Sequence, residues 1–245
     1  MKPLLKRNKI DIGLVGQTIN NTNVIGKYFS MTMYRKALAI LSIGAMAATK
    51  TAAIEFLQAT DAAGTSAKGI PSTAGQAAIA TITANAGVTV ATLALASVAA
   101  ADAVTINGLT FTAHASTTTI ASRQFSAAGT DSADGDELVK CINDATYGVP
   151  GVTATNASGT LTLIATDPGE ATITITNAAA TMTPATVQAQ GYVEIDVSQL
   201  DINNGFVYIS PKVTTTSTAG VCAVTLIRSD GRFEPVQKMA AGKIL

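Results

Sequence analysis

Apolar and polar positions alternate through most of the chain, and this period of two predicts strands rather than helices. Strands are expected at 27–35, 38–45 and 53–58, and the continuous apolar run of the second suggests burial on both faces. Farther along, "ATITANAGVTVATLALA" (80–96) predicts two strands around a turn at Asn85-Ala86-Gly87.

Turn signals divide the middle of the chain into hairpins. In "DAVTINGLTFTAH", Asn107-Gly108 separates 104–106 from 109–111, and both residues tolerate the positive φ of a tight hairpin turn. "GTLTLIATDPGEATITIT" predicts two more strands around Asp167-Pro168-Gly169, where proline presets φ for a turn.

One segment, "DSADGDELVKCINDATYG", carries a helical pattern instead. Its apolar positions recur at i, i+3, i+4 and i+7, namely Leu138, Cys141, Ile142 and Ala145. Ser132 or Asp134 is expected to cap the helix, with Asp136 and Glu137 in the first turn, where the helix dipole favours acids. Gly148 is expected to end it.

Alternation returns near the C-terminal end, at 192–197, 206–213 and 221–228, with a turn at Asn203-Asn204-Gly205. Pro211 lies inside the second of these segments. Because proline cannot donate a ladder hydrogen bond, this segment is predicted to be an edge or bulged strand.

Composition divides the chain into three parts. Residues 71–186 are rich in Ala, Thr, Gly and Ser and nearly free of Lys and Arg, unlike the two ends. Neither end has enough strands to close a sandwich alone, whereas an inserted domain lets the two ends pair. We therefore predict a mainly β protein: a jelly-roll-like β-sandwich from 27–96 and 180–245, with an inserted small α+β domain at 97–179 that contains one helix.

Charge points to an assembly. The 245 residues hold 16 Lys and Arg against 16 Asp and Glu, and only 13% of them are charged. A neutral, weakly charged surface does little to keep copies apart, so a homo-oligomer is expected. Because the body of the chain has no basic stripe, no nucleic-acid partner is expected.

The first 26 residues are predicted to form an extended basic arm. Such an arm either stays solvated or docks on an acidic neighbouring surface, and we expect it to pack on another subunit. The run "MYRKALAILSIGAMAATK" (33–50) resembles a signal peptide, but it lies inside the chain and is too short to span a bilayer. It is interpreted as folded strands, so no membrane is expected; translation from Met31 or Met33 would instead expose it as a signal peptide.

Candidate catalytic chemistry is sparse, and no catalytic, cofactor-binding or metal residues are predicted. His114 is the single histidine and is expected to be a surface or hydrogen-bonded residue. Cys141 and Cys222 are expected to be free, buried and inert. The acids of 131–137 could suggest Ca²⁺, but they lack EF-hand spacing and fit a helix start.

Two further patterns are interpreted as structural. The sequon at 156–158 is expected to be a turn. The stretches "STTT" and "VTTTST" are expected to be exposed strand ends or loops, with a contact surface as the alternative.

Two sets of segments resemble known phage proteins. "NTNVIGKYFSMTMYRKALAILSIGAMAA" with "FLQATDAAGTSAKGI", and the later "YVEIDVSQLDINNGFVYISPKV…CAVTLIRSDGRF", look like the two ends of a β-sandwich family of tailed-bacteriophage virions. The resemblance covers about 22–70 and 187–235. Residues 100–178 are similar to a small module that recurs, inserted or appended, in phage structural proteins.

This resemblance implies a non-enzymatic virion structural protein that docks on the capsid as a cement or decoration protein. Its partners would be the major capsid protein or other virion proteins, with no small-molecule substrate and no cofactor. The first alternative is a tail, neck or fibre component whose inserted domain binds the host. The second is a secreted bacterial adhesin or surface-layer domain.

Overall fold

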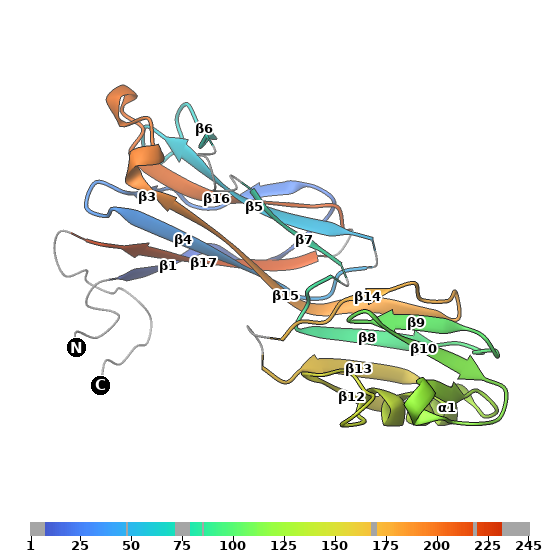
Figure 1. Ribbon diagram of the computed structural model, residues 1–245. Coiled ribbons are helices and arrows are strands. Elements are labelled where there is room, and N and C mark those ends of the chain that lie inside the picture. The colour runs from blue at the N-terminus through green and yellow to red at the C-terminus, as the bar shows by residue number, and fades with distance from the viewer. Residues whose placement is uncertain are drawn as a thin grey trace. The chain divides into compact units, whose positions relative to one another are not determined.

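The computed structural model describes residues 8–47, 49–71, 79–84, 86–167, 171–217 and 220–231 (Figure 1). Within these residues the protein is mainly β, with several antiparallel sheets and a single α-helix, as predicted. The described residues divide into two compact units. The first unit takes its residues from 8–43, 51–82 and 190–231, and the second takes them from 44–50 and 83–189.

The first unit is a sandwich of two sheets. Its strands are β1 (Lys9–Ile19), β2 (Asn23–Ile25), β3 (Phe29–Ser30), β4 (Lys36–Ile43), β5 (Thr51–Ala59), β6 (Lys68–Gly69), β7 (Ile79–Thr83), the second half of β15 (Met182–Asp196), β16 (Tyr208–Thr215) and β17 (Gly220–Ser229). One sheet has the order β1-β17-β4-β15, and the other has the order β2-β16-β5-β6, with β3 also paired to β16 and β7 to β5. Their inner faces bury Ile19, Leu41, Ile54, Phe56, Ile209, Val213, Val224 and Leu226.

The predicted N-terminal arm is wrong for the residues that the structure describes. Lys9–Ile19 pairs along its length with β17, and Asn23–Ile25 pairs with β16 of the same chain. The reason is burial: Leu14 and Ile19 enter the core, so this segment closes the sandwich instead of leaving it. Residues 1–7 lie outside the described residues.

The connection from β2 to β3, which begins at Gly26, depends on a close approach to the backbone of β1. A Cβ atom added to Gly26 would stand 2.1 Å from the carbonyl oxygen of Gly13, so only glycine fits there. The Gly26 N–H also donates to the Pro211 carbonyl oxygen at 2.8 Å, which ties this connection to β16.

Two strand predictions near the N-terminal end need correction. Only Phe29–Ser30 of the predicted strand 27–35 is a strand, because the chain turns at 31–35 before β4 begins. β4 itself alternates between buried and more exposed positions, so it is not buried on both faces. The apolar residues of its second face, Leu38 and Ile40, lie half-exposed instead.

Pro211 does not mark an edge strand, because β16 lies between β2 and β5. Its carbonyl oxygen accepts from Gly26, so its nitrogen faces the same neighbour, where β2 ends at Ile25 and β3 begins at Phe29. The missing N–H therefore falls at a break in the neighbouring strand, where no ladder partner is lost.

The second unit holds the remaining strands of the seven-stranded sheet that β15 continues, a separate four-stranded sheet and the helix. Its elements are the first half of β15, β8 (Val90–Leu95), β9 (Ala103–Ile106), β10 (Leu109–His114), η2 (Ile120–Ser122), β11 (Gln124–Ser126), α1 (Asp131–Ile142), β12 (Val152–Ala157), β13 (Thr160–Ala165) and β14 (Ile175–Thr176). The sheet orders are β15-β8-β13-β12 and β11-β10-β9-β14, and α1 packs against β11, β12 and β13. The remaining short helices, η3 (Val197–Gln199) and η4 (Ile202–Asn204), belong to the first unit.

The helix is confirmed, but its predicted ends are wrong. Thr130 caps it by accepting from the Ala133 N–H, and the helix ends at Ile142 with Asn143 as the C-cap. Asn143 fixes this end because its side chain exchanges two 2.8 Å hydrogen bonds with Ala154 of β12. Leu138, Cys141 and Ile142 form the buried face as predicted, whereas Ala145 lies beyond the helix and is exposed.

The Asn107-Gly108 hairpin is confirmed. Asn107 and Gly108 have φ of 48° and 79°, and β9 pairs with β10 across them. The Asn107 amide also holds the chain before β14, donating to Thr172 at 2.8 Å and accepting from Thr174 at 2.7 Å. The predicted turn at 167–169 falls partly on residues outside the described ones, and β13 and β14 pair with other strands.

The unit boundaries differ from the predicted domain boundaries. β8 pairs with β13 on one side and with the first half of β15 on the other. These hydrogen bonds place 83–96 and 180–189 in the second unit, not in the sandwich. β15 runs through both units, with 182–189 in the second and 190–196 in the first.

The first unit should fold without the insertion. A Cβ atom on Gly191 would stand 3.0 Å from the Ile82 side chain, so the chain leaves and re-enters this unit at neighbouring points. A protein lacking 83–189, with a short Gly-Ser linker from Ile82 to Gln190, should give a β-type circular dichroism spectrum and a cooperative melt. As the comparison, a deletion of 97–180 should be less soluble, because it leaves β8 without β13. An unfolded product from the first deletion would contradict this account.

Candidate functional site

The first candidate site is the outer side of the sheet β1-β17-β4-β15. The strand register aligns apolar residues of neighbouring strands in rows: Ile10 with Ile227 and Leu38, and Ile12 with Thr225 and Ile40. We call this surface the outer face, and its residues are Ile10, Ile12, Leu38, Ile40, Tyr192, Val221, Ala223, Thr225 and Ile227.

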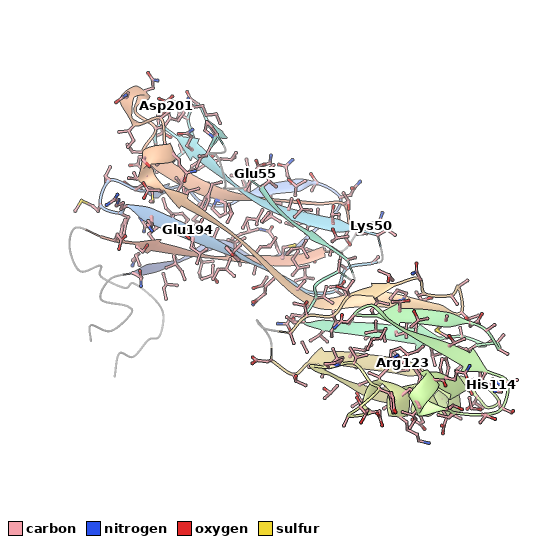
Figure 2. All side chains as sticks on the ribbon, viewed as in Figure 1. Lys50, Glu55, His114, Arg123, Glu194 and Asp201 are labelled. Carbon is pink, nitrogen blue, oxygen red and sulfur yellow. The ribbon has the colours of Figure 1, made fainter. Side chains whose placement is uncertain are left out.

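Side chains of the outer face are unusually apolar for a surface. Ile12 and Tyr192 are each 68% exposed, and Val221 is 50% exposed. Large exposed apolar patches on a soluble protein mark interaction sites more often than isolated apolar residues do. Lys36 and Glu194, which flank the patch, form an ion pair with Nζ and Oε1 4.0 Å apart. Figure 2 labels Glu194, which lies on β15.

The opposite surface of the sandwich is chemically different. On the outer side of β5 and β16, Glu55 and Lys212 stand directly opposite each other and form an ion pair of 2.6 Å. The two side chains of this pair are 27% and 21% exposed. The outer face is the stronger candidate for contact with a partner because Ile12, Tyr192 and Val221 expose large apolar side chains there.

An ion pair joins the first and last strands on the inner side of the same sheet. Arg228 of β17 donates to Asp11 of β1 through Nε at 2.9 Å and contacts it through Nη2 at 2.8 Å. The two side chains are only 11% and 14% exposed. Arg228 also donates through Nη1 to the Ser30 carbonyl at 2.6 Å and lies over the Tyr34 ring, 4.5 Å from its centroid.

Arg228 connects several segments of the first unit. The guanidinium reaches β1, β3 and the loop 31–35, so one side chain fixes strands of both sheets. A guanidinium suits this role because it is planar, permanently charged and able to stack on an aromatic ring. The loop that follows Ser30 is thereby held in place.

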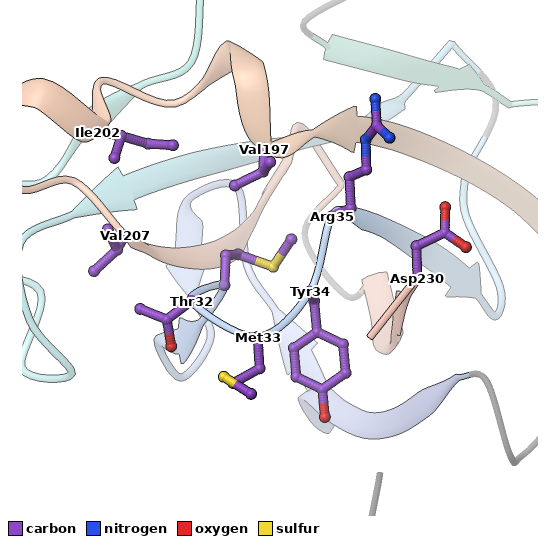
Figure 3. Close-up of a pocket in the computed structure, with 9 residues that line it drawn as sticks. Thr32, Met33, Tyr34, Arg35, Val197, Ile202, Val207 and Asp230 are labelled. Atoms are coloured by element: carbon purple, nitrogen blue, oxygen red, sulfur yellow. The ribbon is translucent and has the colours of Figure 1, made fainter. Parts of the chain in front are cut away.

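The second candidate site is a pocket of about 470 Å³ beside this loop (Figure 3). Its lining comes from the loop 31–35, from η3 and η4, from Val207 directly before β16, and from Asp230 directly after β17. Most of the lining is apolar, namely Met31, Met33, Tyr34, Val197, Ile202 and Val207, while Arg35 and Asp230 bring opposite charges. This size and composition are typical of a site that holds a small apolar ligand or side chain.

Hydrogen bonds keep the pocket walls together. The Arg35 N–H donates to the Ser229 carbonyl at 3.1 Å, and the Val197 N–H donates to the Arg35 carbonyl at 2.7 Å. Asp196 caps η3 through Ser198, and these hydrogen bonds, with a smaller effect of Arg35, hold the pKa of Asp196 below its usual range. Asp196 thus remains a carboxylate next to Arg35 at neutral pH.

His114 ends β10 on the surface, as expected (Figure 2). Its Nδ1 atom accepts from the backbone N–H groups of Ser116 and Thr117 at 3.4 and 3.2 Å. These bonds give the imidazole a role in shaping the following loop.

The acids at the helix start serve the fold. Asp131 accepts from the Ser97 N–H at 2.7 Å, and buried Asp134 accepts from the Gly129 N–H at 2.9 Å. Asp136 accepts from the Asn156 amide at 2.8 Å. In the part of the chain that the structure describes, no three His, Cys, Asp or Glu residues come together as metal ligands would.

Both the nitrogen and the oxygen of the Asn156 side-chain amide, in the predicted sequon, form hydrogen bonds. Its amide nitrogen also donates to the Ser132 carbonyl at 2.7 Å, and its oxygen accepts from the Gly159 N–H at 3.1 Å. Asn156 and Ala157 are the last two residues of β12, so the predicted turn at 156–158 is wrong for them, and the chain turns at Ser158 and Gly159, whose φ values are 52° and 85°.

Both cysteines are free and buried, as predicted. Burial raises the pKa of Cys141 to about 11 and also raises the pKa of Cys222. Because the thiolate is the reactive form, these raised values make both side chains unreactive near neutral pH.

The Thr-rich stretches are only partly exposed. Thr119, at the end of "STTT", pairs with Gln124. In "VTTTST", Thr215 and Ser217 are buried, and Thr216 accepts from the Thr51 N–H at 2.9 Å, so this part of the stretch is structural.

Among the described residues, the helices are too short and too polar to cross a bilayer. Comparison of the chain with protein-family models, with curated proteins and with solved structures gives no match. The sequence patterns predicted neither the outer face nor the pocket. In β4 and β17 the residues on both faces are largely apolar, and this pattern could have indicated the outer face. The pocket brings together segments that are distant in sequence, so no local pattern predicts it.

Removing one partner of the Asp11–Arg228 pair should destabilise the first unit strongly. Asp11→Asn or Arg228→Met should each lower the free energy of unfolding by about 2–4 kcal/mol, because the remaining charge stays buried without its partner. Lys36→Met is the control and should cost less than about 1 kcal/mol, since its pair with Glu194 is half-exposed. Chemical denaturation measures all three. An Asp11→Asn effect as small as that of the control would contradict this role.

Proposed function

We propose that this chain is a structural protein of a tailed-bacteriophage virion, docked in many copies on the capsid as a cement or decoration protein. The observation that carries the proposal is the nested arrangement of the chain. Most described residues of the segments that resemble the two ends of a virion β-sandwich, about 22–70 and 187–235, lie in one compact unit, which β1 also joins. The segment that resembles the phage module lies within the other unit.

The outer face supplies the chemistry for docking. Contact with a shell needs apolar area, matched shape and little charge to oppose packing, and it does not need a cavity. The outer face has exposed Ile12, Tyr192 and Val221 and keeps its flanking charges paired. We assign this face to the capsid contact and the opposite face of the sandwich, with Glu55 and Lys212, to solvent.

Stabilisation of the shell then follows from selective binding. A protein that binds the assembled shell and not its free subunits shifts the assembly equilibrium by mass action. The energy comes from burial of apolar side chains at about 25 cal/mol per Å² of area removed from water. No catalytic step is required.

Shells that lack this protein should open more easily. Particles made without it should release DNA at a lower temperature than complete particles, and adding the purified protein back should raise this temperature to that of complete particles. Light scattering with a DNA-binding dye measures the opening temperature. Equal opening temperatures with and without the protein, under conditions where it is bound, would contradict a cement role.

A charge on the outer face should weaken docking without unfolding the protein. Ile12→Asp should bind shells at least about tenfold more weakly, because a carboxylate buried at an interface loses its hydration. Ile164→Asp is the matched control, since Ile164 is 42% exposed but lies on β13 of the second unit. Co-sedimentation with shells measures binding, and melting curves verify folding. If both variants bind as the unchanged protein does, the outer face is not the contact.

A further inference from the structure

We propose that the pocket beside the loop 31–35 binds a small aliphatic amine in its ammonium form, with the carboxylate of Asp230 as the partner of the charged group. This inference is independent of the virion role, since none of the residues that line the pocket belongs to the outer face. It rests on three observations: the lining is mainly apolar, the size suits a small molecule, and one carboxylate of the lining has no partner.

The apolar lining accounts for the aliphatic part of the ligand. Val197, Ile202 and Val207 bring branched side chains, and Met31 and Met33 bring flexible thioethers that adapt their shape to a neighbour. Met33 and Ile202 are 39% and 46% exposed, so the pocket leaves apolar area in contact with water. An aliphatic chain that covers these side chains removes this area from water, and this burial favours binding.

The size of the pocket suits a small molecule. Its volume of about 470 Å³ lies within the range of about 300–1,000 Å³ that is typical of small-molecule sites. Figure 3 shows Ile202 and Val207 on one side of the pocket and Asp230 on the other. A ligand with an apolar end and a charged end therefore matches the distribution of groups along the lining.

The charges around the pocket determine the sign of the charged end. Arg35 and Asp196 offset each other, because Nε of the arginine lies 3.6 Å from Oδ2 of the aspartate. Arg228 is paired with Asp11 on the inner side of the sheet. In the part of the chain that the structure describes, no side chain forms an ion pair with Asp230, whose side chain is exposed. The pocket therefore presents one uncompensated carboxylate, which attracts a cation.

An alkylammonium ion combines the two required properties. Its chain covers the apolar lining, while its ammonium group lies at the exposed carboxylate of Asp230 and keeps part of its hydration. This placement avoids the large cost of burying an ion away from water. An alkyl carboxylate of the same length has the wrong sign of charge, and an uncharged alcohol gains the apolar contacts alone. Because ion pairs at exposed positions are weak, the charge adds a modest factor to the affinity.

Binding of n-hexylammonium to the full chain, measured by nuclear magnetic resonance titration, tests the proposal. Hexylammonium should bind about two- to fivefold more tightly than 1-hexanol, and hexanoate should bind more weakly than the alcohol. From butylammonium to hexylammonium the affinity should rise by up to about fourfold for each added methylene. Hexanoate that binds as tightly as hexylammonium, or the absence of saturable binding by hexylammonium, would overturn the proposal.

Removal of the carboxylate separates the charge from the apolar contacts. Asp230→Asn should lower the affinity for hexylammonium to that for hexanol and should leave hexanol binding unchanged. Asparagine tolerates the positive φ of 54° at this position, so the backbone is expected to stay in place. Glu194→Gln is the control, because Glu194 is a 50% exposed carboxylate of the same unit that does not line this pocket, and it should change neither affinity.

A substitution in the apolar lining should act on both ligands alike. Ile202→Ser should weaken binding of hexylammonium and of hexanol by a similar factor, about threefold or more, because both lose the same apolar contact. Ile25→Ser is the matched control, since Ile25 is 44% exposed in the same unit and does not line this pocket. Melting curves verify that each variant is folded. An equal loss of hexanol and hexylammonium binding in Asp230→Asn would overturn the proposal, by assigning Asp230 a structural role.

Discussion

The ion pair between Asp11 and Arg228 is the constraint on which the sandwich depends. It joins the first described strand to the last, and Arg228 continues to Ser30 and Tyr34 of the segment that leads into β4. Strands from both ends of the chain must therefore be in place before this charge is satisfied. A guanidinium left buried without its carboxylate costs far more than the pair contributes, which favours one register for β1 against β17.

This closure explains how the chain can carry a second unit in its middle. Ile82 and Gly191 lie side by side, so a short connection between them could replace the insertion without moving the strands of the sandwich. The second unit has its own buried residues, including Phe111, Phe125 and the inner side of α1. The second unit is therefore stabilised by burial of its own side chains. For the sandwich, the insertion only lengthens the connection between Ile82 and Gly191, and the entropic cost of closing a longer loop is small.

Local patterns predicted the strands, the Asn107-Gly108 hairpin and the helix, because each depends on neighbours in sequence. Pairing across long separations was not predictable in this way. The alternation of 9–19 is interrupted by bulges near Gly13 and Gly16. The local pattern therefore did not predict a strand here, although this strand closes the core. The prediction of an edge strand at Pro211 was wrong for a similar reason. The effect of this proline depends on the break between β2 and β3, which lies opposite it. The pocket needs residues of three distant segments, which no window along the sequence contains.

We propose that the apolar sheet face, exposed in the single chain, is covered by a shell in a virion. Cryo-electron microscopy of purified particles of a phage that encodes the chain tests this most directly. We predict density for the protein in many copies on the capsid lattice, with Ile12, Tyr192 and Val221 against the shell and Glu55 and Lys212 toward solvent. Density for a few copies at the neck or tail tip, or its absence from the particle, would contradict the account.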